Sequence, residues 1–223
     1  MENSGKLYVF EGMDGSGKTT LSRLLKHHFD SVGINSLLMT FPGQELGTLG
    51  RHIYQLHHKP LDFQVQSINP TSLQLLHVAA HIDAIDKQIL PALRSGVTVI
   101  LDRFWWSTWA YGSVYGANNT TLRQIIQAEL THWCGIKPTA LFFLNRKSGF
   151  VEKGSTIQGQ RIERAYLNLA RRQQHRHPLL IIQNDKSIEE TMTSLVKYIE
   201  NPRMRSRFRS QGLYVRKSIS RTS

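Results

Sequence analysis

The chain has 223 residues, of which 40% are hydrophobic, and a formal net charge of +12. This length and hydrophobic fraction suit one folded α/β domain and argue against a chain that is disordered as a whole. No apolar run approaches the roughly 18 to 20 residues of a transmembrane helix, and the N-terminus lacks the basic and then apolar plan of a signal peptide. We therefore expect a cytoplasmic protein without a membrane partner.

A glycine-rich loop follows the first apolar run of the chain, Leu7 to Phe10. It matches the P-loop pattern G-x-x-x-x-G-K-[ST] from Gly12 to Thr19. In such a loop the backbone N–H groups face phosphates, Lys18 reaches the β- and γ-phosphates, and the Thr19 hydroxyl binds Mg²⁺. Because apolar residues at helical spacing follow, a chance glycine turn is the weaker interpretation, and we expect ATP and Mg²⁺ as cofactors. The candidate nucleotide-binding residues are Gly12, Met13, Asp14, Gly15, Ser16, Gly17, Lys18, Thr19 and Thr20.

Short apolar runs alternate with helical patterns along the rest of the chain. The predicted strands are 7–10, 36–41, 97–101, 140–144 and 179–182. Predicted helices follow the P-loop and cover 46–56, 73–93, 121–133, 161–173 and 187–200. Parallel strands joined by crossover helices form a doubly wound sheet. The sequence thus predicts a P-loop NTPase fold, with a five-stranded parallel sheet and helices on both faces, in a single domain over residues 1–200.

A carboxylate and a guanidinium follow the third predicted strand, as Asp102-Arg103. Sheets of this type bind ligands beyond the carboxyl ends of their strands, where the P-loop also lies. The acid suits Mg²⁺ or its waters, and the planar guanidinium suits a phosphate. The alternative is a helix cap joined to a salt bridge. Together with the P-loop, the pair favours phosphoryl transfer.

With these motifs, the chain resembles the thymidylate kinase family of P-loop nucleoside monophosphate kinases. The resemblance rests on an ordered set of stretches: 10–20, 41–42, 91–93 leading through 97–104, 107–111, 135–138, 161–170 and 185–190. It implies transfer of the γ-phosphoryl group of ATP to a (deoxy)nucleoside 5′-monophosphate, with dTMP as the default acceptor. It also implies a homodimer.

The resemblance further implies roles for individual residues. Lys18 would hold the transferring phosphoryl group, and Thr19 and Asp102 would bind Mg²⁺. Arg103 would grip the phosphate of the acceptor, and Arg161 matches an arginine that follows the mobile lid. Residues that match the contact with the acceptor's sugar and the walls of its pocket are Asp14, Phe41, Thr108 and Tyr111.

Two histidines replace the groups with which the family holds the acceptor base. The family's acceptor helix carries a stacking phenylalanine and, four residues later, an arginine that hydrogen-bonds to the base; this chain has His77 and His81. Histidine can stack and donate a hydrogen bond, but it lacks the arginine fork. A metal-binding pair and two ordinary helix histidines are the alternatives. The family also often has an arginine after Phe-Pro, and the nearest basic side chain here is Arg51, which we include in the acceptor site.

The predicted lid, 146–160, is short and lacks the family's arginine-rich signature. Its candidate cations are Arg146, Lys147 and Lys153, and a plain connector is the alternative. Residues 201–223 carry a charge of +7 without an acid, against +5 for the remainder. We expect this segment to be a flexible basic tail, either solvated or in contact with nucleic acid or another polyanion.

Three further features leave alternatives open. The aromatic residues Phe104, Trp105, Trp106 and Trp109 are predicted to pack in the core or, as the alternative, to line the acceptor pocket. The single cysteine, Cys134, is predicted to be a core or helix-end residue. A nucleoside kinase that uses Glu11 as its base, and a catalytically weak nucleotide-binding scaffold, are the competing functions.

Overall fold

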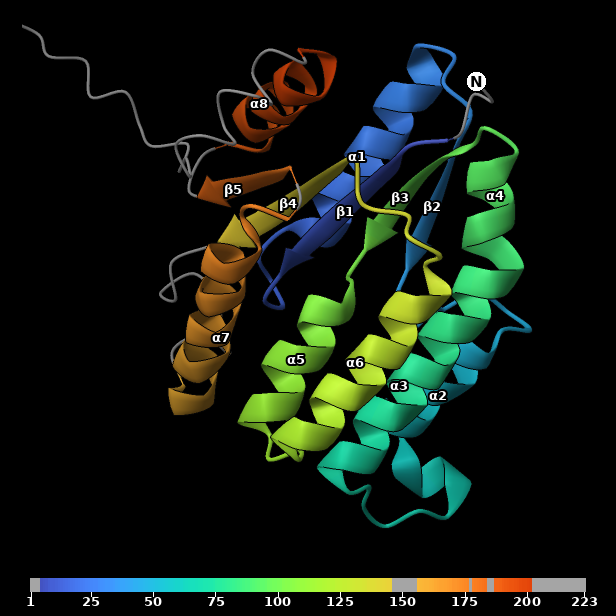
Figure 1. Ribbon diagram of the computed structural model, residues 1–223, viewed down its shortest axis with the longest axis vertical. Coiled ribbons are helices and arrows are strands. Elements are labelled where there is room, and N and C mark those ends of the chain that lie inside the picture. The colour runs from blue at the N-terminus through green and yellow to red at the C-terminus, as the bar shows by residue number, and fades with distance from the viewer. Residues whose placement is uncertain (1–4, 146–155, 177, 184–186, 202–223) are drawn as a thin grey trace, which may run out of the picture.

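The computed structural model describes residues 5–145, 156–176, 178–183 and 187–201. Its centre is a parallel sheet of five strands in the order β2-β3-β1-β4-β5 (Figure 1). The strands are β1 (Leu7–Gly12), β2 (Ser36–Thr40), β3 (Thr98–Asp102), β4 (Ala140–Asn145) and β5 (Leu179–Gln183). All residues of β1 and β3 are buried, as expected for strands that are covered on both faces. The predicted five-stranded, doubly wound sheet is confirmed.

Eight α-helices connect and cover the strands of the described chain. They are α1 (Lys18–Ser31), α2 (Leu49–His58), α3 (Pro70–Ala84), α4 (Leu90–Arg94), α5 (Trp105–Val114), α6 (Asn119–His132), α7 (Ile157–Gln173) and α8 (Ile188–Glu200). A 3₁₀ turn, η1 (Pro60–Phe63), follows α2, and a π-helical turn, η2 (Ile85–Ile89), joins α3 to α4. The predicted long helix is therefore one continuous run with a π turn inside it. Pro91 explains the turn, because its ring would clash with the carbonyl group four residues earlier in a regular helix.

Side-chain caps determine where two helices begin, and the spacing of apolar residues in the sequence predicted these starts at other residues. The predicted helix at 46–56 begins only at Leu49, because the Thr48 side chain accepts a hydrogen bond from the backbone N–H of Arg51. Helix α7 begins at Ile157, before the predicted 161, since Thr156 caps it in the same way. Helix α5 was not among the predicted helices. Its N-cap residue, Phe104, has no side chain that can cap, so no local signal marks the start.

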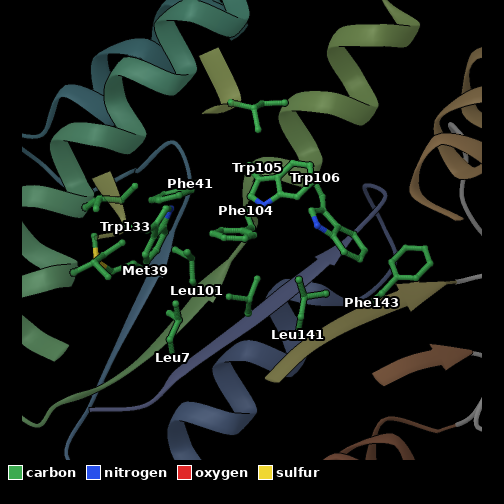
Figure 2. Packing of buried hydrophobic residues seen from close by; sticks show 14 of the residues in the cluster. Leu7, Met39, Phe41, Leu101, Phe104, Trp105, Trp106, Trp133, Leu141 and Phe143 are labelled. Atoms are coloured by element: carbon green, nitrogen blue, oxygen red, sulfur yellow. The ribbon is translucent and has the colours of Figure 1, made fainter. Parts of the chain in front are cut away.

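Apolar side chains fill both faces of the sheet. Helices α1 and α8 cover one face, where Phe10, Leu25 and Leu195 belong to one cluster (Figure 1). Helices α4, α5 and α7 contribute to the cluster on the other face. Figure 2 shows Phe104, Trp105 and Trp106 in this second cluster, together with residues of the strands. The predicted core packing of these three aromatic residues is confirmed, and the half-buried Trp109 packs against the same cluster.

Several predictions concern segments at the margins of the described chain. Cys134 is exposed and follows the end of α6, which confirms a helix-end position and excludes a core position. The candidate lid cations Arg146, Lys147 and Lys153 lie outside the described residues, as does the predicted tail beyond Asn201. Among the residues that the structure describes, none of the helices has the length and apolar character needed to cross a membrane.

Candidate active site

The P-loop joins the end of β1 to the start of α1 at the centre of the sheet. Gly15 and Gly17 have φ angles of 75° and 96°, a left-handed conformation that glycine adopts without steric cost. Lys18 is the first residue of α1, and its Nζ donates a hydrogen bond to the carbonyl oxygen of Met13 at 2.7 Å. Burial, together with the nearby charge of Arg103, lowers the pKa of Lys18 to about 8. A phosphate in the loop would favour the charged ammonium group again.

Thr19 and Asp102 join the P-loop to the end of β3. The Thr19 hydroxyl donates to Asp102 Oδ2 at 2.6 Å. The other carboxylate oxygen, Oδ1, is buried and has no hydrogen-bond partner among the described residues. Because Mg²⁺ takes hard oxygen ligands, a carboxylate with a free oxygen beside a hydroxyl group fits this ion. These contacts place Asp102 at the P-loop, so the alternative of a simple helix cap does not describe it.

Arg103, Asp14 and Tyr111 form one connected cluster beside the P-loop. The Arg103 guanidinium forms an ion pair with Asp14, and its Nη1 donates to Ser107 Oγ at 3.1 Å. The backbone N–H of Asp14 donates to the Tyr111 hydroxyl at 3.0 Å, and the guanidinium carbon lies 5.5 Å from the centre of the Tyr111 ring. Arg103 itself has a φ of 77°, which is uncommon for a residue with a side chain. The backbone is thus held in an unusual conformation where this guanidinium is presented.

A buried carboxylate, Glu11, holds the loop that carries Arg103. Its Oε1 accepts hydrogen bonds from the backbone N–H groups of Phe104 at 2.8 Å and Ser107 at 3.1 Å. Its Oε2 accepts from the hydroxyl groups of Ser107 at 2.8 Å and Tyr166 at 3.3 Å. Glu11 therefore caps α5 from a residue far away in the sequence. Burial raises its pKa to about 7, against the opposing influence of the Arg103 charge.

On the other side of the site, the His81 ring stacks on Phe41, with ring centres 4.1 Å apart and planes at 9°. His81 Nδ1 lies 2.9 Å from Glu129 Oε2, and both side chains are buried. Which atom donates in this contact depends on the tautomer of the imidazole, and the tautomer with the proton on Nδ1 lets the carboxylate accept. Glu129 was missed from the sequence, although an acid beside the apolar residues Ile125 and Ile126 on one face of a helix is a usable signal for a buried polar contact.

His77 lies one turn before His81 on α3. Its ring meets those of His57 and His81 edge-on, with centres 5.0 Å and 6.4 Å away. Burial, with the charges of His81 and His57 as further causes, lowers the pKa of His77 to about 3, so the imidazole is neutral at physiological pH. Its Nε2 is buried without a hydrogen-bond partner in the described chain. Within the described residues, no group of three or more His, Cys, Asp or Glu side chains is arranged to hold a metal ion.

Three further candidates lie on α5, α2 and α7. Thr108 is buried on α5. Arg51 lies on α2, where its Nη1 donates to the carbonyl oxygen of Gln44 at 3.1 Å beside a hollow of about 430 Å³. Arg161 is exposed on α7 and lines a different hollow, between α5 and α7. Neither arginine forms a hydrogen bond or an ion pair with Lys18, Asp102 or Arg103 in the described residues.

Groups suited to a triphosphate and Mg²⁺ thus lie at the carboxyl ends of the strands, and a cluster of aromatic and imidazole rings lies beyond the end of β2. This combination of fold and site defines the class of P-loop nucleotide kinases. The thymidylate kinase family model matches residues 10–195, so the chain belongs to the thymidylate kinase family. It is an ATP-dependent nucleoside monophosphate kinase with ATP and Mg²⁺ as cofactors, as the resemblance implied.

Individual relatives agree with the family match. The thymidylate kinase of Legionella pneumophila (strain Paris) is 31% identical over 88% of this chain and 95% of its own length. That of Pelodictyon phaeoclathratiforme is 37% identical over a shorter stretch, 62% of this chain and 60% of the relative. The crystal structure of thymidylate kinase from Ehrlichia chaffeensis has a TM-score of 0.70 at 23% identity, covering 88% of this chain and 99% of that one. This structural likeness supports the fold.

Proposed function

We propose that this kinase phosphorylates a pyrimidine deoxynucleoside 5′-monophosphate, with dTMP as its default acceptor. The observation that carries the proposal is the position of Arg103, which Asp14 and Ser107 hold beside the P-loop. A fixed guanidinium there suits an acceptor that already carries a phosphate, because it can bind two phosphate oxygens at once. The curated relatives above are thymidylate kinases, which supports dTMP among such acceptors.

In this proposal the donor phosphates occupy the P-loop. Lys18 leaves the Met13 carbonyl and holds the transferring group, while the loop N–H groups bind the phosphate oxygens. Thr19 and Asp102 would hold Mg²⁺, which neutralises charge on the β- and γ-phosphates. Arg103 keeps the acceptor phosphate in line with the donor. Positioning of this kind supplies most of the rate in phosphoryl transfer.

The acceptor nucleoside would lie between the P-loop and α3. Asp14 would contact the sugar, and Phe41, Thr108 and Tyr111 would line the pocket. His77, being neutral, offers a ring for stacking on the base. His81 offers its other ring nitrogen to the base, because Glu129 already takes the proton on Nδ1.

Other parts of the chain complete the proposal. Arg51 would assist at the acceptor side, and Arg161 with the lid cations Arg146, Lys147 and Lys153 would stabilise charge in the transition state. We also propose a cytoplasmic homodimer whose basic tail at 201–223 can contact nucleic acid.

A panel of acceptors tests the proposed function. The purified protein with ATP and Mg²⁺ is offered nucleosides and nucleoside monophosphates in turn, and ADP formation is measured. We expect turnover with particular pyrimidine monophosphates, dTMP foremost, and none after Lys18→Ala. Turnover with nucleosides alone would contradict the proposal, because Arg103 would then have no acceptor phosphate to bind. ATP binding without turnover on any acceptor would favour the scaffold alternative.

A further inference from the structure

A basic groove lies between α5 and α7, two helices that lie side by side in Figure 1. It is a hollow of about 360 Å³ whose lining includes Trp109, Ser113, Arg161, Arg164, Asn168 and Arg172. The last four residues recur on α7 at intervals of three or four, so they form one stripe along the helix. The core-facing residues Ile162, Tyr166 and Leu169 form a separate stripe of the same helix. The arginines of the groove therefore lie on the solvent-exposed side of α7 and are not part of the hydrophobic core.

The groove is separate from the acceptor pocket. On α5, Ser107 is the residue that bonds to Arg103 and Glu11. Trp109 and Ser113 lie two and six residues further on, and a helix turns by roughly 100° per residue. Their side chains therefore leave α5 on a different side from Ser107, whose Oγ lies 2.8 Å from the Tyr166 hydroxyl of α7, and Ser107 does not line the groove. The lining of the groove includes neither Lys18, Asp102 nor Arg103, and Arg161 is its one residue that also has a role in the proposed phosphoryl transfer.

Within the described chain, the positive charge of the groove is not neutralised by acids nearby. Helix α7 carries four arginines and only one acid, Glu163. Among the arginines of the described residues, Arg103 alone takes part in an ion pair. Arg161, Arg164 and Arg172 thus bring three guanidinium groups without an ion-pair partner in this part of the chain to one concave surface. Such a surface concentrates anions around it.

An aromatic ring lies among these cations. Trp109 is half-buried, and the guanidinium carbon of Arg123, on α6, lies 5.5 Å from the centre of its ring. Guanidinium groups along a backbone path, combined with an aromatic ring, are the features with which proteins bind single strands of nucleic acid. A duplex would not use the ring, because its bases are stacked on each other. The volume suits one nucleotide of a strand, since small-ligand pockets begin at about 300 Å³.

We propose that the groove between α5 and α7 binds single-stranded nucleic acid. The phosphates contact Arg161, Arg164 and Arg172, and one base packs against Trp109. The net charge of +12 favours the encounter at long range. This proposal does not depend on the identity of the acceptor nucleotide. It places a polyanion contact on the folded domain, in addition to any contact by the tail.

Binding of a fluorescent 20-nucleotide single strand to the full chain, followed by anisotropy over a series of salt concentrations, tests this proposal. The key variant is Arg164→Ala with Arg172→Ala. The matched control is Arg94→Ala with Arg171→Ala, which removes the same charge from exposed positions that do not line the groove. We expect the groove variant to weaken binding and to lower the slope of log K against log salt by about 1.4, since each phosphate contact on a single strand contributes about 0.7.

Two further measurements separate binding in the groove from binding elsewhere on the chain. Trp109→Leu should weaken binding about 5-fold or more while leaving the salt slope unchanged, because it removes stacking without removing charge. The groove variant should keep its kinase turnover and melting temperature, which shows that the fold is intact. An equal loss in the control pair, a failure of the full chain to bind the strand, or equally tight binding of duplex DNA or of an acidic peptide would overturn the proposal.

Discussion

The phosphate end of the active site and its base end differ in how their side chains are held. At the phosphate end, Lys18 and Thr19 begin a helix and Asp102 ends a strand, so the backbone fixes each of them. At the base end, His81 and Glu129 come from α3 and α6, and only a side-chain contact joins them. This difference implies that side chains at the base end can be replaced, with a change in base recognition, while the residues that bind the phosphates keep their positions. In the proposed function, His77 and His81 are a change of that kind.

Among variants that test the difference between the phosphate end and the base end, we expect replacement of Arg103 to have the largest effect on activity. Arg103→Lys keeps the charge but loses the planar fork and its bond to Ser107. We expect kcat/KM for the monophosphate acceptor to fall by ~10²-fold, as for displacement of a reacting group, with the KM for ATP unchanged. Steady-state kinetics with both substrates varied measures this, and Arg94→Lys is the control. An equal loss for ATP would show that the two phosphate sites are not separable.

Glu11→Gln should have the next largest effect. The amide keeps the shape but turns an N–H group toward donors that now have no acceptor, which costs about 1–3 kcal/mol. Because Glu11 holds the loop of Arg103, we expect kcat to fall ~10-fold, since misplacement of a catalytic group by 1 Å can cost up to ~10²-fold. The loss should be the same for every acceptor base, as measured on the nucleotide panel. A loss of kcat that differs between acceptor bases would show that Glu11 also affects base recognition, and would contradict the separation of the two ends.

Glu129→Gln tests the base end alone. The variant replaces the carboxylate that contacts His81 Nδ1 by an amide of nearly the same volume. We expect the KM for the acceptor to rise several-fold, near the ~10-fold that corresponds to 1.4 kcal/mol, and the ranking of acceptor bases to change. The KM for ATP should not move. Glu163→Gln, on α7, is the control; an unchanged ranking would mean that His81 does not read the base.

The smallest effect concerns stability rather than activity. The pKa of His77 falls from 6.5 to about 3 on folding, so below pH 6.5 the unfolded chain binds a proton that the folded chain does not. The free energy of unfolding is therefore unaffected by His77 above pH 6.5, and it decreases as the pH falls from 6.5 toward 3. His77→Phe should therefore gain stability over the parent on acidification, by up to ~1.4 kcal/mol per pH unit. Melting temperatures at pH 7.5 and 5 measure the gain, with the exposed His52→Phe as the control.

The opposite pKa shift of Glu11 does not disturb this measurement. Its pKa rises from 4.5 to about 7 on folding, so it favours the folded state at low pH and loses that contribution as pH rises through 7. This dependence is common to the parent and the His77 variant and cancels in their difference. A stability difference that is equal at the two pH values would contradict the buried, neutral state of His77.

Local signals made the sheet and the phosphate end predictable from the sequence. The P-loop pattern and the continuous apolar runs are each contained in a short stretch of sequence. They predicted Lys18, Thr19 and Asp102 at the carboxyl-terminal edge of the sheet. Glu11 and Glu129 were beyond such reasoning, because their partners lie 93 and 48 residues away. The start of α5 was missed for the same reason, since its cap is the distant Glu11. The roles of individual site residues stay predictions until the variants above are measured.

The π turn η2 has a consequence for how insertions and deletions act on this enzyme. A π turn accommodates one more residue than a regular helix. At roughly 100° per residue, His81 and Leu93 would point about 120° apart on an unbroken helix, and the extra residue brings them to within about 20°. Both can then face inward, His81 toward Phe41 and Leu93 toward the sheet. Deleting one residue from 85–89 would rotate the histidines away while every residue of the base pocket was still present.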